Sequence, residues 1–112
     1  VVLNFWFIGC KPCLAEMPEL NAVYQEYAEN PEVVFASIAL DKEEKVRKKL
    51  GKYDIEYPIV TDGDVACELF GVSGFPTNMV IDRKGNYHFR FSGGFPGIGK
   101  LVSGSIREAL AK

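Results

Sequence analysis

The most constraining feature of this sequence is an apolar run that leads directly into a C-x-x-C pattern. Residues 1–8 read VVLNFWFI, in which Asn4 is the only polar residue. A run of this length, rich in β-branched and aromatic side chains, is typical of a strand buried on both faces. After Gly9 come Cys10-Lys11-Pro12-Cys13 and then apolar residues at helical spacing. The sequence therefore predicts a central strand followed by a helix with both cysteines in its first turn.

A second apolar run of strand length, at residues 33–40, gives a strand-helix-strand order that requires parallel pairing. Residues 77–81 and 86–91 flank the tight loop Asp82-Arg83-Lys84-Gly85 and are expected to form an antiparallel hairpin. These runs predict an α/β fold in which a central four-stranded mixed sheet is flanked by helices on both faces. By chain order, the expected spatial order of the strands is second, first, third, fourth.

The remaining segments predict helices and one short extended piece. The charged residues 41–49 favour a solvated surface helix, and residues 98–110 carry an apolar stripe typical of a helix packed on the sheet. Residues 57–60 indicate a short extended segment outside the four strands. A brief helix is expected over residues 64–70, with Asp62 available to cap it.

Length and charge limit the classes of function. The 112 residues fit one domain, residues 1–112, and the formal net charge of −2 gives no basic excess for nucleic acid. No apolar run approaches the roughly 18 residues of a membrane span, so we expect no membrane insertion by this domain. Because the sequence opens inside a strand at Val1, we expect an upstream segment in the complete protein, and an anchor could lie there.

The C-x-x-C pair has two common uses, disulfide exchange and metal binding. A helix N-terminus favours the thiolate form of Cys10, the charge of Lys11 adds to this effect, and Pro12 suits the first helical turn. A structural metal site would need further ligands, which Cys67 and His88 could supply by count alone. Otherwise Cys67 is expected to be a small buried side chain. His88 alternates with aromatic neighbours and is expected to lie on the opposite face, without a role.

The segment VVLNFWFIGCKPCLAEMPEL resembles the thioredoxin superfamily, and within it the bacterial TlpA/ResA-like thiol-disulfide oxidoreductases. A second segment, VSGFPT at residues 72–77, resembles the cis-proline loop of that family. The resemblance implies that Cys10 attacks the substrate, that Cys13 resolves the mixed disulfide and that Glu16 transfers a proton. It also implies a cis Pro76 facing the cysteines, with the backbone of Phe75 pairing with substrate.

The chain departs from the family pattern at three points. Asn4 stands where thioredoxin itself has a buried aspartate, so Glu16 becomes the expected proton relay. Gly9 stands where the family usually has tryptophan, which changes the substrate-contact surface formed with Lys11 and Pro12. The strand structure that usually precedes the central strand in this family is absent from the sequence.

The resemblance further implies thiol-disulfide exchange on protein substrates, running as a dithiol reductase fed by an upstream electron-donor protein. It implies a monomer that uses the redox-active Cys10–Cys13 disulfide in place of a cofactor, with no metal. The implied setting is extracytoplasmic, in a bacterium, with a connection to cell redox homeostasis or cytochrome maturation. Disulfide oxidase or isomerase activity would use the same chemistry, and a metal-binding or copper-delivery module would use the same sulfurs as ligands. A peroxiredoxin would need threonine three residues before its reactive cysteine, where this chain has Phe7.

Overall fold

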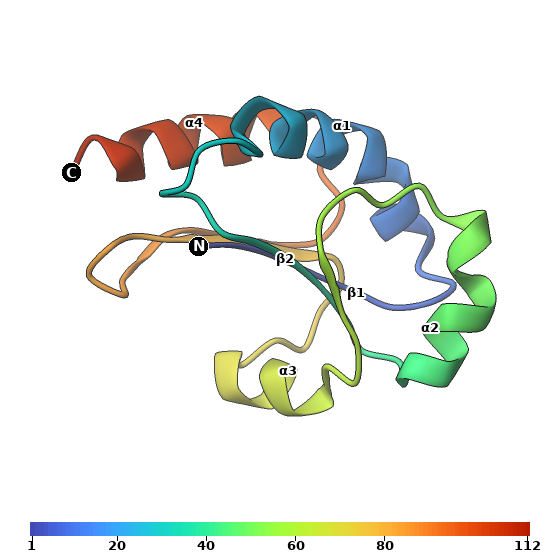
Figure 1. Ribbon diagram of the computed structural model, residues 1–112. Coiled ribbons are helices and arrows are strands. Elements are labelled where there is room, and N and C mark those ends of the chain that lie inside the picture. The colour runs from blue at the N-terminus through green and yellow to red at the C-terminus, as the bar shows by residue number, and fades with distance from the viewer.

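A computed structural model describes all 112 residues and shows a sheet with helices on both faces (Figure 1). The five strands are β1 (Val2–Trp6), β2 (Phe35–Ala39), β3 (Ile59–Val60), β4 (Thr77–Ile81) and β5 (Tyr87–Ser92). The helices are α1 (Lys11–Tyr27), α2 (Glu43–Lys49), α3 (Asp64–Phe70) and α4 (Ile98–Leu110), and the short 3-10 helix η1 (Leu50–Lys52) follows α2. None of the helices is long and apolar enough to cross a membrane.

The sheet has the order β3-β2-β1-β4-β5. Strand β1 pairs in parallel with β2 and antiparallel with β4, and β4 and β5 form the expected hairpin. The predicted order of four strands is therefore confirmed, but the predicted strand count is wrong. The short extended segment around Pro58 contributes β3, which pairs in parallel with Ser37 and Ile38 of β2. A segment of two residues is too short to show the alternation typical of a strand, so only the pairing with β2 identifies β3 as one.

Helices cover both faces of the sheet, as the sequence predicts. Helices α1 and α4 lie side by side on one face and α3 lies on the other (Figure 1). Every residue of β1 is buried, because successive side chains point to opposite faces of the sheet and pack into separate apolar clusters. One core includes Val2, Leu20, Phe35, Val80 and Val102. A second, under α3, includes Leu3, Phe5, Ile38 and Met79, and a third includes Trp6, Cys10 and Cys13.

The start of α3 differs from the prediction. Gly63, not Asp62, is its N-cap, and no side chain caps the helix. A Cβ atom at Gly63 would lie 2.7 Å from a methyl carbon of Ile38, so glycine allows this close approach. Asp62 adopts a left-handed backbone with a φ of 56°, and its carboxylate accepts a hydrogen bond from the Glu43 N–H at 3.2 Å. Asp62 therefore serves the first turn of α2.

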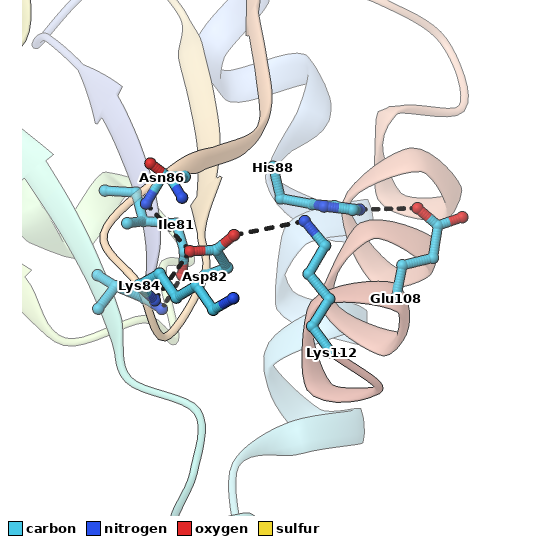
Figure 2. A network of polar contacts seen from close by, with 8 residues as sticks. Ile81, Asp82, Lys84, Asn86, His88, Glu108 and Lys112 are labelled. Atoms are coloured by element: carbon cyan, nitrogen blue, oxygen red, sulfur yellow. Dashed lines mark hydrogen bonds and ion pairs between the residues drawn. The ribbon is translucent and has the colours of Figure 1, made fainter.

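The hairpin contains an irregularity that the sequence did not indicate. Ile81 pairs with Tyr87 and Val80 pairs with Phe89, so His88 is an extra residue in β5. Phe89 packs against the core under α4, and His88 Nε2 lies 2.8 Å from Oε1 of Glu108 on the same helix (Figure 2). The prediction that His88 lies on the face opposite its aromatic neighbours is wrong for Phe89, because the bulge interrupts the alternation.

Candidate redox site

Both cysteines lie where the sequence predicts them, at the N-terminal end of α1. Cys10 is the N-cap residue, Cys13 lies in the first turn, and the two form a disulfide with their Cα atoms 5.3 Å apart. Cys13 is fully buried, whereas Cys10 keeps 3% of its surface exposed. The Cys13 N–H points at Cys10 Sγ, with a distance of 3.3 Å from N to S. In the reduced protein this donor would stabilise a negative charge on Cys10.

The residues around the disulfide form an exposed rim. Gly9, Lys11 and Pro12 are all exposed, and Pro12 occupies the first helical turn. Gly9 has a φ of 91°, and a Cβ atom built there would meet nothing within 4 Å. The TlpA/ResA-like family usually carries tryptophan at this position. In this chain the space beside Gly9, next to Cys10, is therefore open.

The loop at residues 72–77, which resembles the family's cis-proline loop, also packs against the cysteines. The Phe75–Pro76 peptide bond is cis, as expected. Phe75 packs against the buried cluster that contains Cys10 and Cys13, and its ring contacts that of Phe7 edge-on at 5.4 Å. The chain around Pro76 thus lies against the redox pair although more than 60 residues separate them in sequence.

Glu16 lies one helical turn after Cys13 and points into the protein. Its side chain is buried, and Oε1 accepts a hydrogen bond from Asn78 Nδ2 at 2.8 Å. Asn78 Oδ1 in turn accepts from Asn4 Nδ2 at 2.9 Å, which joins α1, β4 and β1 through a buried polar chain. Glu16 Oε2 is buried and has no hydrogen-bond partner.

This environment changes the acidity of Glu16. Burial is the largest effect and raises the pKa of Glu16 to about 7, the hydrogen bond from Asn78 opposes it, and the charge of Glu19 adds to it. The same buried region holds the hydroxyl of Tyr57, which has no hydrogen-bond partner. Burial, followed by the charge of Glu16, raises the pKa of Tyr57. A carboxyl group with a pKa near neutrality can both accept and return a proton at physiological pH.

The sequence did not single out Asn78 or the loop that follows β5. Asn78 is followed by three apolar residues in β4. Asn4 is likewise isolated in a buried strand, and this was the available signal for a paired polar contact. The loop contributes Gly94, Phe95 and Pro96 to a groove of about 340 Å³ that is also lined by Pro12, Ala15, Glu16 and Glu19. Only the fold places that loop beside the redox helix, so no local pattern could reveal it.

The structure does not bring Cys67 and His88, the further candidate metal ligands, together with the cysteine pair. Cys67 is buried in the core under α3 as a free thiol, and His88 lies in the hairpin beside Glu108. No group of three or more histidine, cysteine, aspartate or glutamate side chains is arranged to hold a metal ion. The arrangement does not favour the metal-binding alternative.

A buried cysteine pair at a helix N-terminus, contacted by a cis-proline loop on a mixed sheet, defines a thioredoxin-like redox domain. Comparison with known proteins places the chain more closely: residues 1–89 match the AhpC/TSA family, and the chain belongs to that family.

Three proteins illustrate its relatives. The thiol-disulfide oxidoreductase ResA of Bacillus thuringiensis subsp. konkukian (strain 97-27) is 36% identical over 86 residues, which are 76% of this chain and 50% of the relative. The thioredoxin-like protein YneN of Bacillus subtilis (strain 168) is 37% identical over 87 residues, 76% of this chain and 51% of YneN. A crystal structure of a putative thiol:disulfide interchange protein DsbE from Chlorobium tepidum has a TM-score of 0.84 and 27% identity, covering 97% of this chain and 78% of that one. The chain spans about half the length of the curated relatives it matches.

Proposed function

We propose that this chain is a thiol-disulfide oxidoreductase that works as a dithiol reductase of protein disulfides. The observation that carries the proposal is the Cys10–Cys13 disulfide at the start of α1, with the buried Glu16 one turn further along. The names of ResA, a thiol-disulfide oxidoreductase, and of DsbE, a putative thiol:disulfide interchange protein, support the same chemistry. Phe7, in place of the threonine of a peroxiredoxin, argues against peroxide reduction within this family.

In the proposed reaction, the Cys10 thiolate attacks one sulfur of a substrate disulfide, whose S–S bond breaks and releases the first substrate thiolate. Cys13 then loses its proton and attacks Cys10 Sγ, which forms the Cys10–Cys13 disulfide and releases the second substrate thiolate. Two electrons pass from the domain to the substrate. An external dithiol, which we propose belongs to an electron-donor protein, must reduce the domain again.

We assign proton transfer to Glu16. It lies three residues after Cys13 on α1, and its pKa of about 7 allows it to take up the proton that Cys13 releases. The substrate segment is proposed to lie across the open surface at Gly9, Lys11 and Pro12. The backbone of Phe75, which precedes cis Pro76, would then pair with the substrate as an added strand.

The setting of the reaction is proposed from the TlpA/ResA resemblance. We place the protein outside the bacterial cytoplasm, acting as a monomer on protein thiols, in redox homeostasis or cytochrome maturation. Fractionation of cells that express the complete protein, together with the oligomeric state of that protein in solution, tests these assignments. Recovery in the cytoplasm would contradict the setting.

Trapping of the mixed disulfide tests the reaction itself. In a Cys13→Ala variant, the mixed disulfide on Cys10 cannot be resolved, so a reducible adduct with a disulfide-containing substrate should accumulate. A Cys10→Ala variant provides the matched control and should form none. Equal adducts in both variants, or in neither, would contradict the assigned order of attack.

The reduction potential of the cysteine pair tests the direction. Equilibration in defined dithiothreitol or glutathione buffers, with thiol trapping and mass detection, should give a value at or below about −250 mV for a reductase. A value between about −180 and −120 mV would assign the domain to isomerase or oxidase chemistry instead.

A further inference from the structure

The turn between β1 and α1 leaves two consecutive backbone donors without a backbone acceptor. Cys10 N–H bonds the Phe7 carbonyl at 3.2 Å, but no backbone carbonyl accepts from the N–H groups of Ile8 and Gly9. Side chains from a distant segment accept both. Asp41 Oδ2 lies 2.6 Å from Ile8 N, and Tyr53 Oη lies 3.2 Å from Gly9 N.

Both acceptors belong to the segment that carries α2 and η1. Asp41 lies two residues after the end of β2, and Tyr53 follows η1. In Figure 1 this segment lies beside the start of α1. The segment therefore touches the redox turn at both of its ends, on the two residues that immediately precede Cys10.

Each acceptor is itself held in place. The backbone carbonyl of Asp41 accepts a hydrogen bond from Asp62 N–H at 2.8 Å, and its Oδ1 pairs with Lys45 Nζ at 3.2 Å. The Asp41 side chain is only 13% exposed. The Tyr53 ring packs on the buried Trp6 with ring centroids 5.7 Å apart, which fixes the direction of its hydroxyl.

We propose that Asp41 and Tyr53 are positioning residues for the redox turn and that together they hold Cys10 in the geometry required for attack. This inference rests on the proposed thiol-disulfide exchange. The two hydrogen bonds fix the peptide planes on either side of Ile8, and Gly9 is the residue with the greatest backbone freedom in the turn. Without them, Gly9 would sample conformations in which the Cys10 sulfur no longer meets the substrate in line.

The open space above Gly9 explains why such a support is needed here. No side chain at Gly9 packs against the surroundings, because a Cβ atom built there would contact nothing. The turn therefore takes its rigidity from its backbone hydrogen bonds. The Tyr53 hydroxyl makes one of these bonds at Gly9 itself.

Amide hydrogen exchange tests the geometry independently of activity. In the oxidised wild-type protein, the Ile8 and Gly9 amides should exchange at least tenfold more slowly than an unbonded amide. Tyr53→Phe keeps the ring but removes the acceptor, and should accelerate exchange at Gly9 while leaving Ile8 protected. Asp41→Ala should accelerate Ile8, and Asp41→Asn, whose amide oxygen can accept the same bond, should restore its protection. Fast exchange of both amides in the wild type would overturn the proposal.

The rate of disulfide exchange tests the consequence for Cys10. Tyr53→Phe and Asp41→Ala should each lower the second-order rate constant with a substrate disulfide by about three- to tenfold, and Asp41→Asn should recover most of that loss. Tyr87→Phe is the matched control, because the half-exposed Tyr87 ring lies on β5 over Arg90; its rate should equal the wild-type rate. Unchanged rates in Tyr53→Phe and Asp41→Ala, with faster exchange of the two amides, would show that the turn needs no such support. A wild-type protein without any exchange activity would instead contradict the proposed function and leave the amide result standing.

Discussion

Two carboxylates in different regions of the molecule, Glu16 and Asp82, differ in burial and in the number of hydrogen-bond donors around them. Glu16 lies inside the protein beside the cysteine pair, with one hydrogen bond to Oε1 and none to Oε2. Asp82 lies in the hairpin loop, at the end of the sheet where Ile81 N–H bonds the Val1 carbonyl. It accepts from the Lys84 and Asn86 N–H groups at 2.9 and 3.0 Å and from Lys112 Nζ at 3.4 Å (Figure 2).

The two environments move the pKa values in opposite directions. The backbone hydrogen bond from Asn86 is the largest effect at Asp82, and with the other donors it lowers the pKa of Asp82 below its usual value. Burial outweighs the single donor at Glu16 and raises its pKa to about 7. Asp82 therefore stays ionised and stabilises the turn, whereas Glu16 is poised to exchange a proton. A carboxylate rich in donors serves structure, and one poor in donors is available for chemistry.

The largest expected difference between the two regions is in activity. Glu16→Gln keeps the shape and an acceptor for Asn78 but removes the titrating group, and should lower the rate of disulfide exchange at pH 7 by about 100-fold. Asp82→Asn should leave that rate unchanged. Turnover of an insulin-type disulfide substrate measures the rate of each variant. Equal losses of rate in Glu16→Gln and Asp82→Asn would contradict the assignment of proton transfer to Glu16 alone.

The second difference is the pH dependence of stability. The pKa of Glu16 rises from its ordinary value of 4.5 to about 7 on folding. The folded state therefore holds the proton more tightly, and the free energy of unfolding should fall as pH rises from about 4.5 to about 7. After allowance for solvent screening, this loss amounts to roughly 2 kcal/mol. Urea unfolding across this range should show the loss in the wild type but not in Glu16→Gln, relative to their values at pH 4.5.

These regions also show what the sequence could and could not predict. The apolar run at residues 1–8, the cysteine spacing and the hairpin loop are local patterns, and the elements that they predict are present. The cis bond before Pro76 was expected from the family resemblance and is confirmed. Cys10, Cys13 and Glu16 were named as candidates from the cysteine spacing and from the resemblance to the TlpA/ResA-like family.

What the sequence missed depends on contacts between distant segments. The strand β3 exists through its pairing with β2, and the bulge at His88 is decided by register between β4 and β5. Asp62 looked like a helix cap because it precedes α3, but its carboxylate bonds the start of α2. Asn78 reaches Glu16 across 62 positions of sequence, and no local periodicity reports such a contact.

The hairpin region should show a smaller effect, in stability alone. Asp82→Ala removes the acceptor for two backbone N–H groups and for Lys112, so the melting temperature at pH 7 should drop by about 4 °C. Because the folded pKa of Asp82 is lowered, its contribution is present above the ordinary value of 3.8 and is lost as pH falls through the folded pKa. Thermal melts of wild type and variant should therefore converge at strongly acidic pH. A constant difference at every pH would assign the loss to packing rather than to charge.

The smallest effect is expected in the pH dependence of the rate when the Glu16 carboxylate loses its one hydrogen-bond donor. The Asn78 side chain supplies the only hydrogen bond to Glu16, and this bond lowers the pKa of Glu16 against the larger effect of burial. Asn78→Ala should therefore move the midpoint of the pH–rate profile to higher pH, because an ionised Glu16 would lose its only donor. Asn4→Ala is the matched control, since Asn4 donates its hydrogen bond to Asn78 Oδ1 and not to Glu16. A midpoint that moves equally in both variants would show that the whole polar chain, and not the donor to Glu16, sets the acidity of this carboxyl.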